Sequence, residues 1–184
     1  MKYSVEIYNN SPDNKARFVL GTKGLNPLFV LGLNPSTADE NKPDMTISKT
    51  MTFAKNAGFD SFVMLNLYAQ RTPVPENVDK TLNKLLHQEN IEKIGELLSN
   101  YKKCSILSAW GETINIRPFF SKCLKDINDS INHLDIEWLK IGSLTQSGHP
   151  RHPSRAAYKY GLTKFDLKYY LKEQLNEPIY TTGI

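Results

Sequence analysis

Cysteine is scarce in this chain, with two in 184 residues, too few for a framework of disulfides. Both lie in segments that read as a strand and a helix, so we expect Cys104 and Cys123 to be reduced thiols in the core. Long apolar runs are also missing. No segment is long enough to cross a membrane, and residues 1–6 lack the apolar core of a signal peptide. These absences predict a cytoplasmic protein with no membrane partner.

The common sequence signatures of nucleotide-binding loops and activated nucleophiles are absent as well. There is no Gly-x-x-x-x-Gly-Lys segment to cradle phosphates and no Gly-x-Gly-x-x-Gly fingerprint of a dinucleotide fold. A Gly-x-Ser-x-Gly nucleophile elbow is missing, and neither cysteine has a catalytic signature around it. The sequence therefore does not predict an enzyme of any of these types.

What is present is ordinary globular composition, with 40% hydrophobic and 10% aromatic residues. The length predicts a single domain over 1–184, with an N-terminal hairpin (1–24), an α/β core (25–162) and a C-terminal helix and tail (163–184). A net charge of +4 is compatible with a polyanionic partner, although a mildly basic solvated surface explains it equally well.

Apolar strands alternate with amphipathic helices along most of the chain. Two strand-like segments form a hairpin (2–8 and 16–20), and further strands are expected at 28–33, 61–67, 104–109 and 136–141. Helices are expected at about 46–57 and 79–100, across 116–127, and at 163–175. Strands joined by crossover helices form a parallel sheet with helices on both faces. The predicted fold class is therefore α/β, a three-layer sandwich with a mainly parallel four-stranded central sheet plus the N-terminal β-hairpin.

Polar residues follow each of the four core strands. The carboxyl ends of parallel strands share one edge of the sheet, which is where open α/β sheets bind ligands. Four segments are expected to meet there, namely 34–36, Asn66 with Arg71, 110–112 and 149–155. A cleft formed by these segments is therefore the candidate site.

The first of these segments follows an abrupt change from apolar to polar residues. Gly32 lets the backbone approach a ligand closely, and Asn34 carries both a donor and an acceptor. Ser36 can cap the turn that follows. An isolated Asn-Pro-Ser would be a plain turn between a strand and a loop, but here three further polar segments accompany it.

Asn66 interrupts an otherwise apolar strand. A buried amide needs hydrogen-bond partners, and its donor and acceptor match the Watson–Crick edge of a nucleobase. The alternative is a structural amide that braces a loop. Trp110 ends another strand and could stack on a base, with core packing as the alternative.

The loop at 147–155 contains two histidines, two arginines and two prolines, which favours an anion-binding loop over a plain solvated one. His149 and His152 could ligate a metal, but no cysteine joins them and the prolines disfavour a helical ligand spacing, so we expect no metal site. The carboxylates of 39–44 could bind a cation, although loop solubility and helix capping by Asp44 explain them more simply.

The order of these motifs resembles a bacterial and phage domain family of unknown function. The motifs are Gly-Leu-Asn-Pro-Ser-Thr-Ala-Asp (32–39), Asn-Leu-Tyr-Ala-Gln-Arg (66–71), Ala-Trp-Gly (109–111) and Gly-His-Pro-Arg-His-Pro (148–153). The resemblance covers roughly 28–154 of the chain. The motifs that carry this resemblance lie in the same segments that we expect to meet in the cleft at the sheet edge.

More distantly, the layout resembles the uracil-DNA glycosylase superfamily. In that superfamily a Gly-x-Asn-Pro or Gly-x-Asp-Pro loop positions the attacking water, and a strand ending in Asn reads the base. A later strand ends in Trp-Gly, and a His-Pro-Ser loop stabilises the departing base and grips DNA. The matching residues here are 32–35, 64–66, 109–111 and 152–154.

These observations together assign a role to each candidate residue. Cleavage of a glycosidic bond would use Asn34 to orient a water and His152 to stabilise the departing base. A base would be held by Asn66 and an aromatic wall, and phosphates by hydroxyl and guanidinium groups. The base-binding residues are Asn66, Trp110 and Tyr68, and the phosphate-binding residues are Ser36, Arg71, Arg151, Ser154 and Arg155. The expected partner is nucleic acid or a nucleotide, and no metal or organic cofactor is needed.

Two departures from the glycosylase pattern keep alternatives open. Position 34 is Asn rather than Asp, so a strong general base is absent there, and residues 155–157 offer no large apolar wedge for base flipping. The alternative function is therefore a module that binds a nucleotide or modified base in the same cleft without cleaving it. A third possibility is a scaffold whose functional surface lies elsewhere, such as on the N-terminal hairpin.

Overall fold

The computed structural model describes residues 3–175, so the expected C-terminal tail lies outside the described residues. The strands are β1 (Ile7–Asn10), β2 (Arg17–Gly21), β3 (Pro27–Gly32), β4 (Ser61–Asn66), β5 (Cys104–Ser108), β6 (Ile136–Ile141) and β7 (Leu162–Lys164). The α-helices are α1 (Met45–Asn56), α2 (Lys84–Leu98), α3 (Phe119–Ile131) and α4 (Leu167–Glu173). The short 3₁₀ helices are η1 (Pro75–Asn77), η2 (Gly111–Ile116), η3 (Pro153–Arg155) and η4 (Tyr158–Tyr160).

All seven strands form one mixed sheet in the order β1-β2-β4-β3-β5-β6-β7. The inner strands β4, β3, β5 and β6 are parallel, as the alternation of strands and helices predicts. The expectation of a four-stranded sheet with a separate hairpin is corrected, because β2 pairs antiparallel with β4 and carries the hairpin into the sheet. At the opposite edge, β7 pairs antiparallel with β6. The fold class is therefore α/β with a seven-stranded sheet.

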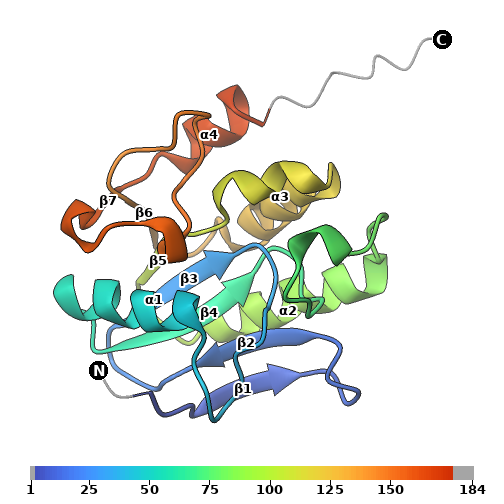
Figure 1. The fold of residues 1–184 in the computed structure, drawn as a ribbon, viewed down its shortest axis with the longest axis horizontal. Helices are drawn as coiled ribbons and strands as arrows, with labels where there is room; N and C mark the ends of the chain where they lie inside the picture. The colour runs from blue at the N-terminus through green and yellow to red at the C-terminus, as the bar shows by residue number, and fades with distance from the viewer. Residues whose placement is uncertain (1–2, 176–184) are drawn as a thin grey trace.

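Helices cover both faces of the sheet, giving three layers (Figure 1). Along β3, side chains alternate between the two faces: Leu28 and Val30 pack on the side of α1, whereas Phe29 and Leu31 pack on the side of α2 and α3. This period of two is the expected geometry of a strand that is buried on both faces. The central strands are consequently fixed in register, and so are the loops that follow them.

Helices α1 and α2 each begin where a side chain accepts a backbone N–H. Asp44 caps α1 by accepting the N–H of Ile47 at 2.9 Å, which confirms the capping role expected for this carboxylate. Asn83 caps α2 by accepting the N–H of Leu86 at 3.2 Å. The helix expected from residue 79 therefore starts later, because η1 and its following turn occupy the preceding residues.

The C-terminal part differs from the single helix expected over 163–175. The chain instead forms β7 beside β6 and then the short helix α4. Gly161, with a φ of +61°, reverses the chain so that Leu162 pairs with Ile141. Asp166 then caps α4 by accepting the N–H of Tyr169 at 2.8 Å. A three-residue strand is too short to show a period of two in the sequence.

Both cysteines are buried free thiols, as predicted. Burial raises the pKa of Cys104 to about 11 and that of Cys123 to about 12, so both remain protonated at neutral pH. Within residues 3–175, none of the helices has the length and apolar character that crossing a bilayer requires.

Candidate functional site

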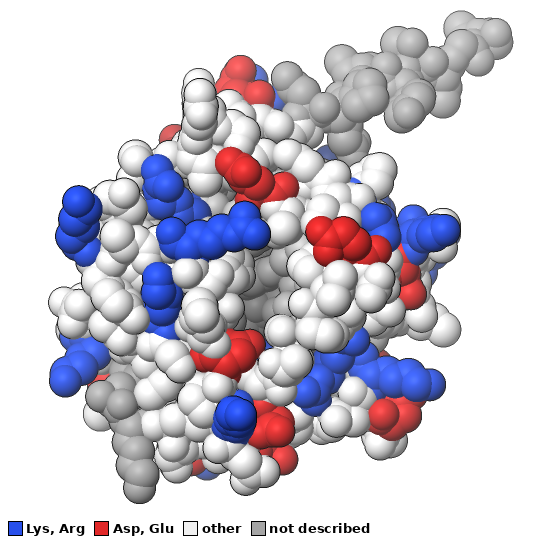
Figure 2. All heavy atoms as spheres, in the orientation of Figure 1, with Lys and Arg blue, Asp and Glu red and all other residues white. Residues whose placement is uncertain are grey.

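A cavity of about 550 Å³ lies at the carboxyl edge of the parallel strands. Its wall includes residues that follow β3, β4, β5 and β6, so the four polar segments meet as the sequence predicts. The N-terminal turn of α1 completes the wall on one side. Figure 2 shows a hollow near the centre of one face, with acidic and basic side chains around it. The cavity volume is typical of a small-molecule site.

Seven of the ten predicted site residues line this cavity. They come from three of the four expected segments, which lie far apart in the chain. They are Asn34, Ser36, Asn66, Arg151, His152, Ser154 and Arg155.

The amide of Asn34 is oriented by the loop that follows β4. Its Nδ2 donates to the backbone carbonyls of Pro35, at 3.1 Å, and Thr72, at 3.0 Å, and more weakly to that of Gln70 at 3.4 Å. No hydrogen bond to Asn34 Oδ1 forms among residues 3–175. This side chain therefore offers the cavity a fixed acceptor and no free donor.

Asn66 ends β4 with a side-chain amide that has no protein partner. The residue is 2% exposed, and its Nδ2 is shielded from water without a hydrogen bond in the described part of the chain. The side chain of Asn90 holds the Asn66 backbone instead, donating to its carbonyl at 2.9 Å. A Cβ added at Gly32 would lie 3.5 Å from Asn66 Oδ1, so the glycine leaves room beside this amide. An unpartnered buried donor on a cavity wall indicates a ligand acceptor.

His152 presents a neutral hydrogen-bond donor. The N–H of Ser154 donates to His152 Nδ1 at 3.3 Å, and Ser154 Oγ lies 2.7 Å from the same nitrogen. Because Nδ1 accepts, the proton is on Nε2. Burial lowers the pKa of His152 from its ordinary value near 6.5 to about 4, and the Arg155 guanidinium acts in the same direction. The imidazole is therefore uncharged at neutral pH.

The loop that carries His152 is held from two sides. Lys49 of α1 donates from Nζ to the carbonyls of Ser154, at 3.1 Å, and Ala156, at 2.8 Å. The second contact is with Gly111, which has a φ of +64°. A Cβ added there would lie 3.1 Å from the Cβ of His152. These contacts fix the imidazole relative to the strand ends.

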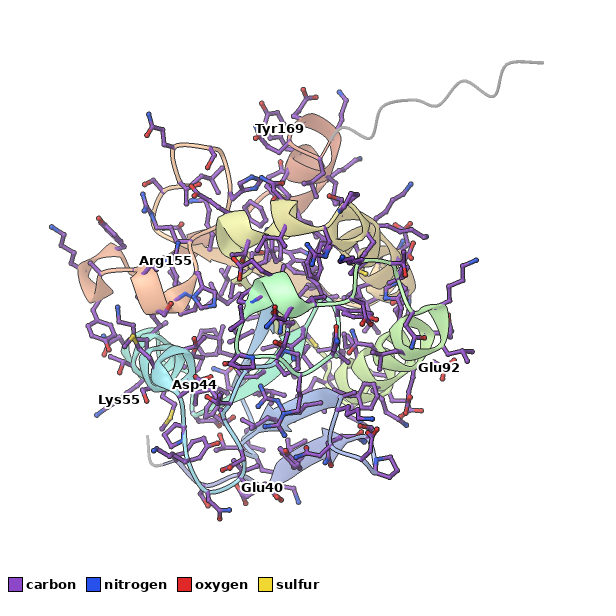
Figure 3. The ribbon with its side chains drawn as sticks, turned by 45° about the vertical axis from the view of Figure 1, so that its right-hand side comes forward. Glu40, Asp44, Lys55, Glu92, Arg155 and Tyr169 are labelled. Carbon is purple, nitrogen blue, oxygen red and sulfur yellow. The ribbon has the colours of Figure 1, made fainter. Side chains whose placement is uncertain are left out.

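The two arginines of this loop differ in their surroundings. Arg151 donates from Nε to the Ser143 carbonyl at 2.9 Å, and its guanidinium lies over the ring of Tyr160. Arg155 is exposed and makes no ion pair within residues 3–175. Figure 3 shows Arg155 on the segment after β6, on the side of the molecule where Asp44 begins α1. Arg155 is thus the most exposed of the three arginines on the cavity wall.

Two predicted base-binding aromatics lie in the core rather than on the cavity wall, which corrects that part of the prediction. Trp110 is fully buried, and its Nε1 donates to the hydroxyl of Tyr170 at 3.1 Å. Tyr68 is also fully buried, and its hydroxyl donates to Asp79 at 2.7 Å. Both rings pack under the loops because strand-end aromatics find their apolar surface in the core.

Arg71 also lies outside the cavity wall, although it was expected to bind phosphate. Its Nη1 donates to the hydroxyl of Tyr8, at 3.1 Å, and to the side chain of Asn14, at 2.6 Å. Its Nη2 donates to the carbonyl of Ala38 at 3.3 Å. The guanidinium therefore joins the N-terminal hairpin to the loop after β3.

His149 is also part of the core. Its Nδ1 lies 2.8 Å from the Tyr170 hydroxyl, and its Nε2 lies 2.9 Å from Asn115 Nδ2. Burial lowers the pKa of His149 from its ordinary value. Across residues 3–175 there is no cluster of three or more His, Cys, Asp or Glu side chains suited to a metal ion.

Three charged residues on the cavity wall were not among the predicted site residues: Arg17 was missed, Asp44 was assigned to helix capping, and Glu112 was placed in the cleft without a role. A cation inside the apolar run Ala-Arg-Phe-Val-Leu was the available signal for Arg17. Asp44 was explained by its capping role. Glu112 lies directly after the Trp-Gly pair, and a hydrogen bond from Ser147 lowers the pKa of its carboxyl.

No curated protein and no solved structure shows significant similarity to this chain. A family model matches residues 17–154, which run from the start of β2 into η3 and include the cavity wall except Arg155. On that match, the chain belongs to the family described as "Protein of unknown function (DUF1643)".

Proposed function

We propose that the cavity binds a nucleobase with its attached sugar and hydrolyses the N-glycosidic bond between them. The observation that carries the proposal is the unpartnered amide of Asn66 on the same wall as the neutral donor of His152. Four parallel strands with polar residues at their carboxyl ends also support a fold like that of the uracil-DNA glycosylases.

Asn66 is the base-reading residue in this proposal. Its free Nδ2 donates to a carbonyl or ring nitrogen of the base, and its Oδ1 accepts from an N–H. A bound base would satisfy the donor that the protein leaves unpaired. The energetic benefit is the recovery of a desolvation cost of about 1–3 kcal/mol.

His152 acts on the departing base. When the C1′–N bond breaks, its electron pair stays on the base, and the sugar becomes cation-like. The Nε2–H donates to the base as negative charge develops there. Because the imidazole is neutral, it stabilises this charge by a hydrogen bond without titrating near pH 7. Removing one such donor raises a reaction barrier by about 2.7–4 kcal/mol.

Asn34 orients the water that attacks the sugar. Its Oδ1 is the free acceptor on the cavity wall, and it can hold a water by one O–H while the water oxygen adds to C1′. An amide does not take the proton that the water loses. The carboxylates of Asp44 and Glu112, which also line the cavity, supply an acceptor for it.

Binding without cleavage is the second candidate function. It is favoured by the amide at position 34, where a carboxylate would be a stronger base, and by the buried Ala156, which follows the His-Pro-Ser loop where duplex base flipping needs an apolar wedge. The cavity, Asn66 and Arg155 serve this function equally well.

A glycosidase assay across uracil, mismatched and modified bases, in single and double strands and in free nucleotides, tests the proposal. We expect His152→Ala to lower turnover by about 10²–10³ and Asn34→Ala to lower it as well. Exposed His133 and Asn132 provide matched control substitutions to Ala that should leave turnover unchanged.

Turnover that survives both cavity substitutions would contradict the assigned roles. Absence of turnover on every base, combined with nucleotide binding in a calorimetric titration, would select the binding function. Absence of both cleavage and binding would favour the third possibility, a scaffold whose functional surface lies elsewhere.

A further inference from the structure

Arg17 on the cavity wall is a buried cation that forms no ion pair with the described residues. It belongs to β2, is 3% exposed and lines the cavity. Its Nη1 donates to the backbone carbonyl of Ala38, and its Nε has no partner in the described part of the chain. No carboxylate lies within 4.0 Å of the guanidinium among residues 3–175.

The surroundings make this charge still less favourable. Arg71 donates to the same Ala38 carbonyl from Nη2 at 3.3 Å, which places a second guanidinium nearby. Burial, and then the charge of Arg71, lower the pKa of Arg17. Asp44 lines the same cavity and its charge opposes this shift, but it lies beyond ion-pair distance and one of its oxygens caps α1. Burying a charge without an ion-pair partner is energetically costly, so its presence needs a reason.

We infer that Arg17 binds a terminal phosphate of a small nucleotide that enters the cavity. The inference rests on the proposed function of the cavity and names its ligand class. A phosphate accepts N–H donors from a guanidinium, and its negative charge compensates a cation that no carboxylate pairs. A ligand that is a nucleoside monophosphate meets both the amide of Asn66 and the cation of Arg17.

The position of Arg17 favours a terminal phosphate over a phosphodiester. In the sheet, β2 lies next to β4, so Arg17 is near the Asn66 end of the cavity and away from the exposed Arg155. A residue that is 3% exposed is reached only by a group that enters the cavity. A polynucleotide backbone continues in both directions, whereas a monophosphate ends and fits within about 550 Å³.

Calorimetric titration of the full chain with nucleoside 5′-monophosphates, the matching nucleosides and inorganic phosphate tests this inference. We expect Arg17→Met to weaken monophosphate binding by about tenfold to a hundredfold and to leave nucleoside binding unchanged. Lys15→Met removes the same charge from an exposed position, and we expect it to change affinity by less than about twofold.

A second variant allows the same inference to be tested if Arg17→Met does not fold. Arg17→Lys retains the charge but loses the planar pair of donors, and it should still weaken monophosphate binding. Folding of each variant is checked by its thermal midpoint, and we expect that of Arg17→Met to be no lower than that of the unsubstituted protein.

The outcomes separate this inference from the proposed function. Monophosphate affinity equal to nucleoside affinity, or insensitive to Arg17→Met, would overturn the phosphate site while leaving base recognition standing. An oligonucleotide that binds more tightly than the monophosphate would also overturn it. Arg17-dependent binding of inorganic phosphate without any gain from a base would support the anion site and contradict the proposed function.

Discussion

Asn66 carries an amide that forms no hydrogen bond with the described residues although its nitrogen is shielded from water. Asn90, also fully buried, uses its amide differently, donating to the backbone carbonyls of Asn66 and Leu67. One amide therefore braces the end of β4, which is the structural role that the sequence left open for Asn66. The other has no hydrogen-bond partner among the described residues.

We predict that Asn66→Ala changes the free energy of unfolding by less than about 1 kcal/mol, because no internal hydrogen bond is lost and an unpaired donor is removed. Asn90→Ala is the matched control and should cost about 1–3 kcal/mol, since it leaves two carbonyls without their donor. Chemical denaturation measures both. Equal losses for the two variants would show that Asn66 has a structural partner.

His152 should make stability depend on pH. Its pKa in the folded state is about 4, below the ordinary value near 6.5, so between these values the unfolded chain binds a proton that the folded chain does not. The free energy of unfolding is therefore unaffected by this group above about pH 6.5 and falls as the pH drops toward 4. By pH 4.5 we expect the loss to be roughly 2–3 kcal/mol.

The measurement is the free energy of unfolding from pH 7.5 to 4.5 for the unsubstituted protein and for His152→Gln. Buried His149 contributes in the same direction in both proteins, so the difference between the two curves isolates His152. Parallel curves would contradict the neutral buried imidazole.

At the scale of elements, the loop between β6 and β7 is positioned by the turn after β5. Gly111 combines a positive φ with close approach to His152, so a side chain here would strain the backbone and press against His152. Gly58, which ends α1, has a φ of +83° with nothing within 4 Å of its added Cβ. An alanine at Gly58 would therefore introduce similar backbone strain without contacting a neighbouring residue.

We expect Gly111→Ala and Gly58→Ala each to lower the free energy of unfolding by about 1 kcal/mol or more through the left-handed backbone. Only Gly111→Ala should also weaken nucleotide binding, because its methyl group displaces the imidazole. Denaturation and a binding titration measure the two effects. Loss of binding in both variants would point to general loosening instead of a displaced His152.

The sequence predicted the elements whose patterns are long and regular. The four parallel strands follow from apolar runs that end in polar residues, and α1 follows from its capping Asp44 and a stop at Gly58. The sequence pattern did not predict the three-residue β7 or the late start of α2. Both depend on tertiary contacts, namely pairing with β6 and the turn after η1.

At the scale of the whole molecule, the topology explains why most of the site could be predicted. Parallel strands bring their carboxyl ends to one edge, so Asn34, Asn66 and His152 meet although they are far apart in the chain. The aromatics Trp110 and Tyr68 could not be assigned correctly, because a strand-end ring can face either the cavity or the core. Arg17 was missed because joining of the hairpin to β4 brings it to this edge.

We propose that one nucleotide occupies this cavity, with its base on Asn66 and its phosphate on Arg17. The decisive measurement is a crystal structure of the protein soaked with nucleoside 5′-monophosphates. We expect a base within hydrogen-bond distance of the Asn66 side-chain amide and a phosphate on the Arg17 guanidinium. An empty cavity at saturating nucleotide, or a nucleotide bound elsewhere on the surface, would contradict it.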